Sequence, residues 1–223
     1  MGHELFIGTG GLVLCGGRSS RMGRPKEWLP FGKYTVLRKV VDELQSALPM
    51  VIVSATSGQR LPVLPGPVAR IDDPVARQGP LVGLAGGILR AHELGWEWVF
   101  ACAGDMPLLR AELIRRLATL LSDQDDAVVP LHAGHPQPLT AIYRTRTAAA
   151  LQRRAQAGPS ALRDCLNEIN TRYIEPALYA DIDPDGESFL GVNTPEEYER
   201  ALQLAGLSPS PGHREQTSSG DPL

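Results

Sequence analysis

One stretch near the N-terminus constrains the fold more than any other: Gly11–Lys26, which reads GLVLCGGRSSRMGRPK. Its apolar run LVL is too short for a helix and is bounded by glycine, which favours a strand. The Gly16-Gly17 pair breaks this strand, a basic loop follows, and a helical pattern begins at about Tyr34. A strand, a glycine-rich loop and a helix in this order are typical of an α/β sheet that binds anions at the carboxyl ends of its strands.

The residues of this loop suit phosphate groups. Gly16 and Gly17 lack Cβ atoms, so the backbone can turn sharply and bring N–H groups close to a ligand. Arg18, Arg21 and Lys26 add positive charge, arginine as a fork and lysine as a point charge. The alternative is an ordinary tight turn with solvated arginines, but the spacing Gly-Gly-x-x-x-Arg-Met-Gly-x-x-Lys favours a phosphate site.

Two familiar phosphate motifs do not fit this loop. The P-loop ends in Gly-Lys-Ser/Thr, whereas Lys26 stands between Pro25 and Glu27. The dinucleotide fingerprint has its glycines just after a strand, whereas the glycines at positions 8, 10 and 11 precede one.

Composition narrows the class of protein. The 223 residues are 43% hydrophobic and 21% charged, which is ordinary for one globular domain. A net charge of −3 and a pI near 6.0 give no global basic surface, so we expect no nucleic-acid partner and only a local anion site.

The cysteines and the termini indicate a cytoplasmic protein. Cys15, Cys102 and Cys165 lie far apart and match no metal spacing, so we expect reduced thiols. No apolar run approaches the ~20 residues of a membrane helix, and the N-terminus does not resemble a secretion signal, so we expect no membrane partner.

Hydrophobic patterns divide the chain into alternating strands and helices. We expect an extension at 1–10, an α/β domain at 11–206, and a disordered tail at 207–223 that is rich in Pro, Gly and Ser. The alternation predicts three layers around a mostly parallel sheet. The predicted strands are 12–14, 50–54, 68–71, 98–103, 127–131, part of 134–144 and 171–175. The predicted helices begin at about 34, 80, 145, 161 and 195, and a further helix after the strand at 98–103 has Leu113, Ile114, Leu117 and Leu120-Leu121 on one face.

The helix that begins at Gly79-Pro80 contains unusual glycines. Gly83, Gly86 and Gly87 each cost a helix about 0.5–1 kcal/mol relative to alanine. Close packing of the helix on the sheet and contact of its first turn with a ligand are both open explanations.

An aspartate follows the strand at 98–103. Asp105 lies in Gly-Asp-Met-Pro, at the predicted carboxyl edge of the sheet. Mg²⁺ prefers oxygen ligands and is commonly held by one or two carboxylates and substrate phosphates, so Asp105 is a candidate Mg²⁺ ligand. The alternative is a solvated aspartate that starts the next helix.

These motifs together resemble a known family. The segment LCGGRSSRMGRPKEWLPFG resembles the signature of the nucleotidyltransferases related to molybdenum cofactor guanylyltransferase, with Cys15 where that family usually has Ala. GPLVGL, GDMP and the Gln-Pro-Leu at 137–139 resemble further family elements. The resemblance implies a Rossmann-like nucleotidyltransferase fold in which one late strand is antiparallel.

The resemblance also implies roles for residues. Leu14, Cys15, Gly16, Gly17 and Gly79 would bind the nucleotide with Lys26 and Asp105. Arg21, Lys26 and Asp105 would be catalytic, with Asp105 holding the metal.

Other roles are less defined. Asp72 and Asp73 would help hold the guanine base, without a choice between them. Ser160, Arg163 and Asn193 are acceptor-side candidates, and Gly191 replaces a family Asn, so the polar contact of that Asn is absent.

The implied reaction is transfer of GMP from GTP to molybdopterin, with Mg²⁺ as cofactor and pyrophosphate as product. Molybdoenzymes or cofactor-biosynthesis proteins are candidate partners. Three alternatives stay open: a CTP-dependent molybdopterin cytidylyltransferase, a sugar- or alcohol-phosphate nucleotidyltransferase, and a degenerate member that binds the cofactor without turnover. Retention of Arg21, Lys26 and Asp105 together argues against the last.

Overall fold

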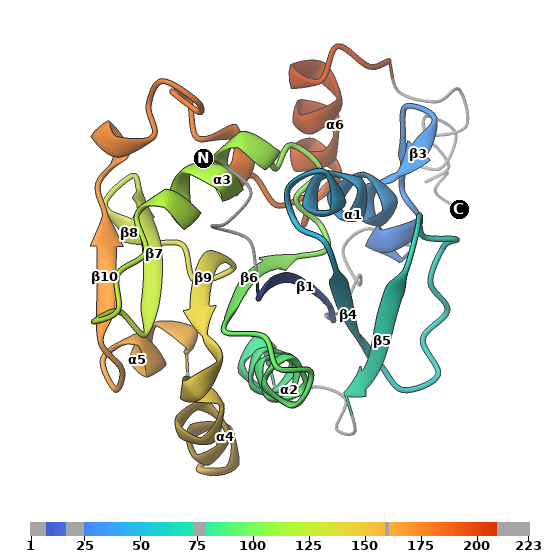
Figure 1. Ribbon diagram of the computed structural model, residues 1–223. Helices are drawn as coiled ribbons and strands as arrows, with labels where there is room; N and C mark the ends of the chain where they lie inside the picture. The colour runs from blue at the N-terminus through green and yellow to red at the C-terminus, as the bar shows by residue number, and fades with distance from the viewer. Residues whose placement is uncertain (1–7, 17–24, 74–78, 159–160, 209–223) are drawn as a thin grey trace, which may run out of the picture.

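Alternating strands and helices build a central sheet that is covered on both faces (Figure 1). The computed structural model describes residues 8–16, 25–73, 79–158 and 161–208. The strands are β1 (Thr9–Cys15), β2 (Pro30–Phe31), β3 (Tyr34–Thr35), β4 (Val51–Thr56), β5 (Val68–Asp73), β6 (Trp98–Ala103), β7 (Ala127–His132), β8 (His135–Pro136), β9 (Thr140–Arg144) and β10 (Thr171–Ile174). The α-helices are α1 (Val36–Ala47), α2 (Pro80–Glu93), α3 (Ala111–Thr119), α4 (Ala148–Gln156), α5 (Leu162–Leu166) and α6 (Pro195–Leu204). Short 3₁₀ turns span Lys26–Trp28, Thr145–Thr147, Pro176–Leu178 and Glu187–Phe189.

The main sheet is mostly parallel. Seven strands follow the order β10-β7-β9-β6-β1-β4-β5, and β8 pairs with β7. β1 is parallel to both of its neighbours, with Gly11 opposite Val51 of β4 and Phe100 of β6. Only β9 in this row is antiparallel, to β6 on one side and to β7 on the other. The predicted fold class and its late antiparallel strand are therefore confirmed.

Alternation along β1 explains the two outer layers. Val13 and Cys15 face one apolar cluster, which α1 and α3 complete, whereas Leu12 and Leu14 face another, which α2, α4 and α5 complete. All four side chains are buried, because a central parallel strand has helices on both faces. Figure 1 shows α1 and α3 above the sheet and α2, α4 and α5 below it.

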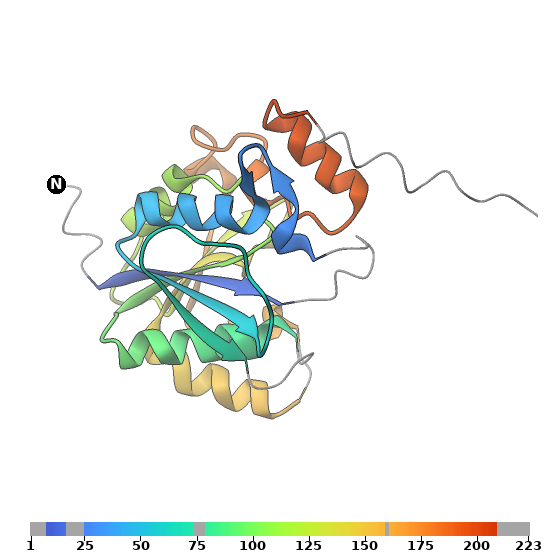
Figure 2. The same cartoon turned by 90° about the vertical axis from the view of Figure 1, so that its right-hand side faces the viewer.

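A third apolar cluster attaches α6 to the short hairpin β2–β3, and Figure 2 shows the two side by side. Leu29, Phe31 and Val36 pack with Val192, and Tyr198 donates from its hydroxyl to the Pro30 carbonyl at 2.5 Å. The hairpin follows the basic loop directly, so this cluster brings the C-terminal part of the chain to the loop.

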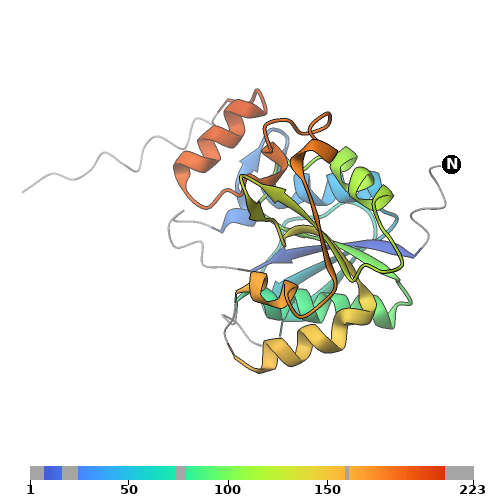
Figure 3. The same ribbon diagram turned by 90° about the vertical axis from the view of Figure 1, so that its left-hand side faces the viewer.

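Several boundaries differ from the sequence expectation. β1 begins at Thr9, because residues 9 and 10 already pair with Trp98 and Val99 of β6. The helix expected from about Tyr34 begins at Val36, because Tyr34 and Thr35 pair with β2 and the Thr35 hydroxyl then caps α1. Between β10 and α6 the only helical elements are two short 3₁₀ turns, and Figure 3 shows this orange segment beside α3.

The glycines of α2 have different surroundings. A Cβ at Gly87 would lie 2.3 Å from a methyl carbon of Leu12, so this glycine lets the helix pack closely on β1. A Cβ at Gly86 would meet nothing within 4 Å. Close packing therefore explains Gly87 and leaves Gly86 without a packing role.

These surroundings predict opposite effects of one substitution at adjacent positions. Gly87→Ala should destabilise the fold by about 1–3 kcal/mol, because the new methyl group overpacks a buried contact. Gly86→Ala should stabilise it by about 0.5–1 kcal/mol through helix propensity. Denaturant unfolding of both variants measures the two free energies, and an equal effect at both positions would contradict the assignment.

Candidate functional site

The loops that carry the predicted site residues meet at one edge of the sheet. β1, β4, β5 and β6 are parallel, so their carboxyl ends lie at the same edge. Leu14 and Gly16 are at the end of β1, and the Gly104 N–H donates to the Leu14 carbonyl at 2.9 Å. This bond fixes the loop that begins at Gly104 against the start of the basic loop.

Lys26 is the centre of the described site. Its Nζ donates to Asp105 Oδ2 at 3.0 Å and to Asn193 Oδ1 at 2.6 Å. The Lys26 and Asp105 side chains are only 17% and 22% exposed, so their ion pair is partly shielded from water. One ammonium group therefore joins three segments that are far apart in the sequence.

The start of α6 explains the position of Asn193. Thr194 caps this helix by accepting from Glu197 N, and the Glu197 carboxylate accepts in return from Thr194 N. The same Glu197 Oε2 accepts from Asn193 N at 2.7 Å, so the capping box also fixes the Asn193 backbone. Asn193, expected on the acceptor side, lies with Lys26 and Asp105.

A series of hydrogen bonds through the loop after β4 connects Glu27, the neighbour of Lys26, to Asp72. Glu27, next to Lys26, accepts from Gln59 Nε2 at 2.6 Å, and the Gln59 carbonyl accepts from Arg70 Nη1 at 2.8 Å. Arg70 Nε then donates to Asp72 Oδ1 at 2.7 Å. Asp73 ends β5. The sequence analysis missed Glu27 and Gln59, because no local pattern marks a contact between residues 32 positions apart.

Gly79 starts α2 in a conformation that favours glycine. Its φ is +85°, in the region that L side chains rarely adopt, and Pro80 then occupies the first helical position. The expected Gly79-Pro80 helix start is therefore confirmed.

Oxygen atoms around Lys26 suit a hard cation. The part of the chain that the structure describes holds no group of three or more His, Cys, Asp and Glu that could bind a metal by itself. Asp105 Oδ2 and Asn193 Oδ1 already face one cation, the Lys26 ammonium. The Asp105 carboxylate fits a Mg²⁺ that takes its remaining ligands from phosphates and water.

Cys15 lies beside this site and is buried. Burial raises the pKa of its thiol far above the usual range, and the carboxylates of Glu27 and Asp105 raise it further, against a smaller opposing effect of Arg70. Cys15 is therefore an uncharged thiol at neutral pH and contributes shape and not a nucleophile.

Of the remaining predicted site residues, the structure describes one and leaves three outside the described ranges. Arg163 lies exposed on α5 and makes no hydrogen bond or ion pair with another described residue, so the geometry does not join it to Lys26. Gly17, Arg21 and Ser160 lie outside the described residues.

No helix within residues 8–16, 25–73, 79–158 and 161–208 has the length and hydropathy needed to cross a membrane.

The burial of the cysteines predicts slow thiol chemistry. Cys15, Cys102 and Cys165 are all buried, and burial raises the pKa of Cys102 as well as that of Cys15. At pH 8 the folded protein should react with Ellman's reagent far more slowly than the protein in guanidinium chloride, which should release three equivalents. Rapid labelling of Cys15 in the folded state, located by peptide mass spectrometry, would contradict this environment.

Comparisons with known proteins identify the family of this chain. Residues 11–172 match the family model described as MobA-like NTP transferase domain. A protein of Mycobacterium avium (strain 104) named probable molybdenum cofactor guanylyltransferase is 34% identical over 197 residues, covering 87% of this chain and 95% of that protein. A protein of the same name from Mycobacterium tuberculosis (strain H37Rv) is 41% identical over 150 residues, covering 66% and 74%.

A solved structure shares the fold. Molybdopterin-guanine dinucleotide biosynthesis protein A from Archaeoglobus fulgidus superposes with a TM-score of 0.71 at 22% identity, covering 88% of this chain and 98% of that one. The family model spans most of the chain, and the relative from Mycobacterium avium is similar over nearly its whole length. The chain therefore belongs to the family of MobA-like NTP transferases.

Proposed function

We propose that this protein transfers GMP from GTP to molybdopterin and releases pyrophosphate. The relatives from Mycobacterium carry the name of this activity, and the chain matches one of them over 95% of its length. The observation that carries the proposal is the Lys26 contact, since it places a cation and a carboxylate together at the edge where the basic loop begins.

In this reaction the terminal phosphate of the acceptor attacks the α-phosphorus of GTP. A new P–O bond forms, the bond to the β-phosphate breaks, and pyrophosphate leaves with the electron pair. An acceptor phosphate is already anionic near neutral pH, so the site needs no general base. Catalysis then depends on positioning and on neutralising charge around the α-phosphorus.

Each site residue has a place in this proposal. Lys26 would neutralise charge on the triphosphate, with Arg21 and the Gly16-Gly17 backbone at the phosphates. Asn193 Oδ1 accepts from Lys26 Nζ independently of Asp105, so Lys26 keeps one fixed partner whatever charge the Asp105 carboxylate faces. Asp72 or Asp73 would hold the base.

Asp105 would hold Mg²⁺, which would take its remaining ligands from phosphates and water. The metal when bound would supply positive charge to the phosphates and orient them. The three cysteines are free thiols, which supports a cytoplasmic location for the reaction. Molybdoenzymes or other cofactor-biosynthesis proteins would receive the product.

A nucleotide panel tests the base and the acceptor. Calorimetry with Mg²⁺ should give tightest binding for GTP among GTP, CTP, ATP and UTP. Pyrophosphate release should then require both GTP and molybdopterin. A preference for CTP would assign the protein to cytidylyl transfer, and binding of molybdopterin without turnover of any nucleotide would support a cofactor carrier.

Substitution of Lys26 separates an enzyme from a carrier. Lys26→Ala should lower kcat for GMP transfer by about 10²–10³-fold, because a preorganised charge at the reacting phosphates is lost. Binding of molybdopterin should persist. Lys33→Ala is the matched control, because the Lys33 ammonium lies over the Tyr34 ring in the adjacent hairpin turn. This variant should leave kcat within about twofold. A Lys26→Ala protein with wild-type turnover would contradict the assigned role.

A further inference from the structure

Arg110, just before α3, clamps the segment that leads to Asn193. Its Nη1 donates to the Ile182 carbonyl at 2.9 Å, and its Nη2 donates to Glu187 Oε2 at 2.5 Å. Its Nε lies 3.7 Å from Asp183 Oδ1. One guanidinium group thus reaches three residues within a six-residue stretch, as its rigid fork of donors allows.

The buried carboxylate of Asp183 holds the turn that follows it, and Arg110 lies next to this carboxylate. Asp183 is buried, and its two oxygens accept from Glu187 N and Ser188 N, both at 3.0 Å. These bonds fold the turn at Glu187–Phe189. A buried carboxylate is costly without a compensating charge, and Arg110 supplies that charge.

The same two segments meet again at the site. Val192 N donates to the Asp105 carbonyl at 2.9 Å. Arg110 and Asp105 both belong to the stretch between β6 and α3, so this stretch holds the C-terminal segment at two points. Between them, a Cβ at Gly191 would lie 3.2 Å from Asn193 Nδ2, so the Asn193 side chain lies close to this glycine.

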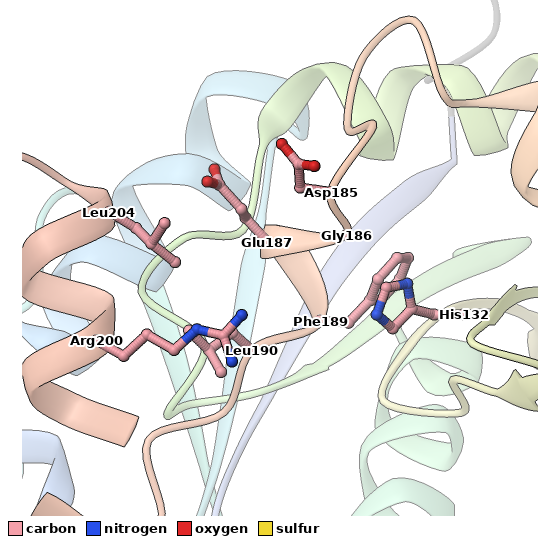
Figure 4. A pocket seen from close by; sticks show the side chains of 8 residues that line it. All are labelled: His132, Asp185, Gly186, Glu187, Phe189, Leu190, Arg200 and Leu204. Carbon is pink, nitrogen blue, oxygen red and sulfur yellow. The ribbon is translucent and has the colours of Figure 1, made fainter. Parts of the chain in front are cut away.

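On its other side the segment faces a cavity. A space of about 420 Å³ lies between α6 and the end of β7, and its wall includes Glu187, Leu190, His132 and Arg200 (Figure 4). In that view Arg200 extends from α6 into the space between the helix and the segment. Glu187 therefore lies both in the wall of this space and in the contact with Arg110.

From these contacts we infer that Arg110 is a positioning residue for GMP transfer: it fixes the 182–193 segment so that Asn193 holds Lys26. This inference rests on the proposed function for its effect on rate, whereas the clamp itself is independent of that function. Arg110 acts through Asn193 and not on the substrate.

Arg110→Met should lower kcat about 10- to 100-fold, because displacement of positioning groups by about 1 Å costs up to 10²-fold. Arg110→Lys, which keeps the charge and loses the fork, should recover part of this loss. In an Asn193→Ala background, Arg110→Met should have less than about a twofold further effect on kcat, since coupled residues are not additive. Equal effects of Arg110→Met in both backgrounds would overturn the inference.

Arg116 offers a matched control on α3. It donates to the Leu178 carbonyl at 2.6 Å and to both oxygens of Asp181, so it ties the start of the same segment. Arg116→Met should lower thermal stability less than Arg110→Met, because Asp181 is exposed whereas Asp183 is buried, and it should leave kcat within about twofold. If Arg116→Met lowered kcat as much as Arg110→Met does, Arg110 would have only a general stabilising role, and the inference would be overturned. If Arg110→Met does not fold, Glu187→Gln should lower kcat about threefold and couple to Asn193→Ala in the same way.

A second readout needs no turnover. The NMR signals of the Asn193 side-chain amide, identified by their loss in Asn193→Ala, should shift in Arg110→Met and not in Arg116→Met. Unshifted signals in Arg110→Met would overturn the clamp. An inactive wild-type protein that still showed the shift would contradict the proposed function while supporting the clamp.

Discussion

The position of the Lys26 ammonium between Asp105 and Asn193 depends on contacts between distant parts of the chain. The bond between Gly104 N and the Leu14 carbonyl sets the Asp105 loop beside the end of β1. The cluster of β2–β3 with α6 brings Asn193 back to Lys26 from 167 residues away. Because hydrogen bonds to charged groups are worth about 1.5–3 kcal/mol, the site also stabilises the junction between these parts.

The sequence predicted what depends on short-range patterns. The apolar run of β1, the break at Gly16 and the Gly79-Pro80 start of α2 follow from local chemistry, and the structure confirms each. The direction of β9 came only from the family resemblance, because apolar alternation does not distinguish parallel from antiparallel pairing. The β2–β3 hairpin has two residues in each strand, too few for any period to be visible.

Long-range contacts were beyond the sequence. The start of a helix at about residue 195 was recognisable, but the partner of Asn193 was not, because the fold and not the local sequence brings Lys26 to it. Arg110 stands before a helix without serving as a side-chain cap, so no local pattern marks it. Its importance depends on Asp183, a buried carboxylate 73 residues later whose need for a counter-charge is visible only in three dimensions.

The pair of Cys15 and Gly104 shows how the site accommodates a departure from its family. By the family resemblance described above, Cys15 stands at a position where alanine is usual, so it adds a sulfur atom at the end of β1. A Cβ on Gly104 would lie only 2.9 Å from Cys15 Sγ and 3.2 Å from a methyl carbon of Leu37. The larger residue on β1 is thus matched by the smallest residue on the neighbouring loop. Gly104 N also donates to the Leu14 carbonyl, and this hydrogen bond aligns the Asp105 loop. A larger residue at position 104 would clash with Cys15 Sγ and so would displace the backbone that makes this hydrogen bond. The two positions therefore constrain each other, and tolerance at Cys15 depends on keeping glycine at 104.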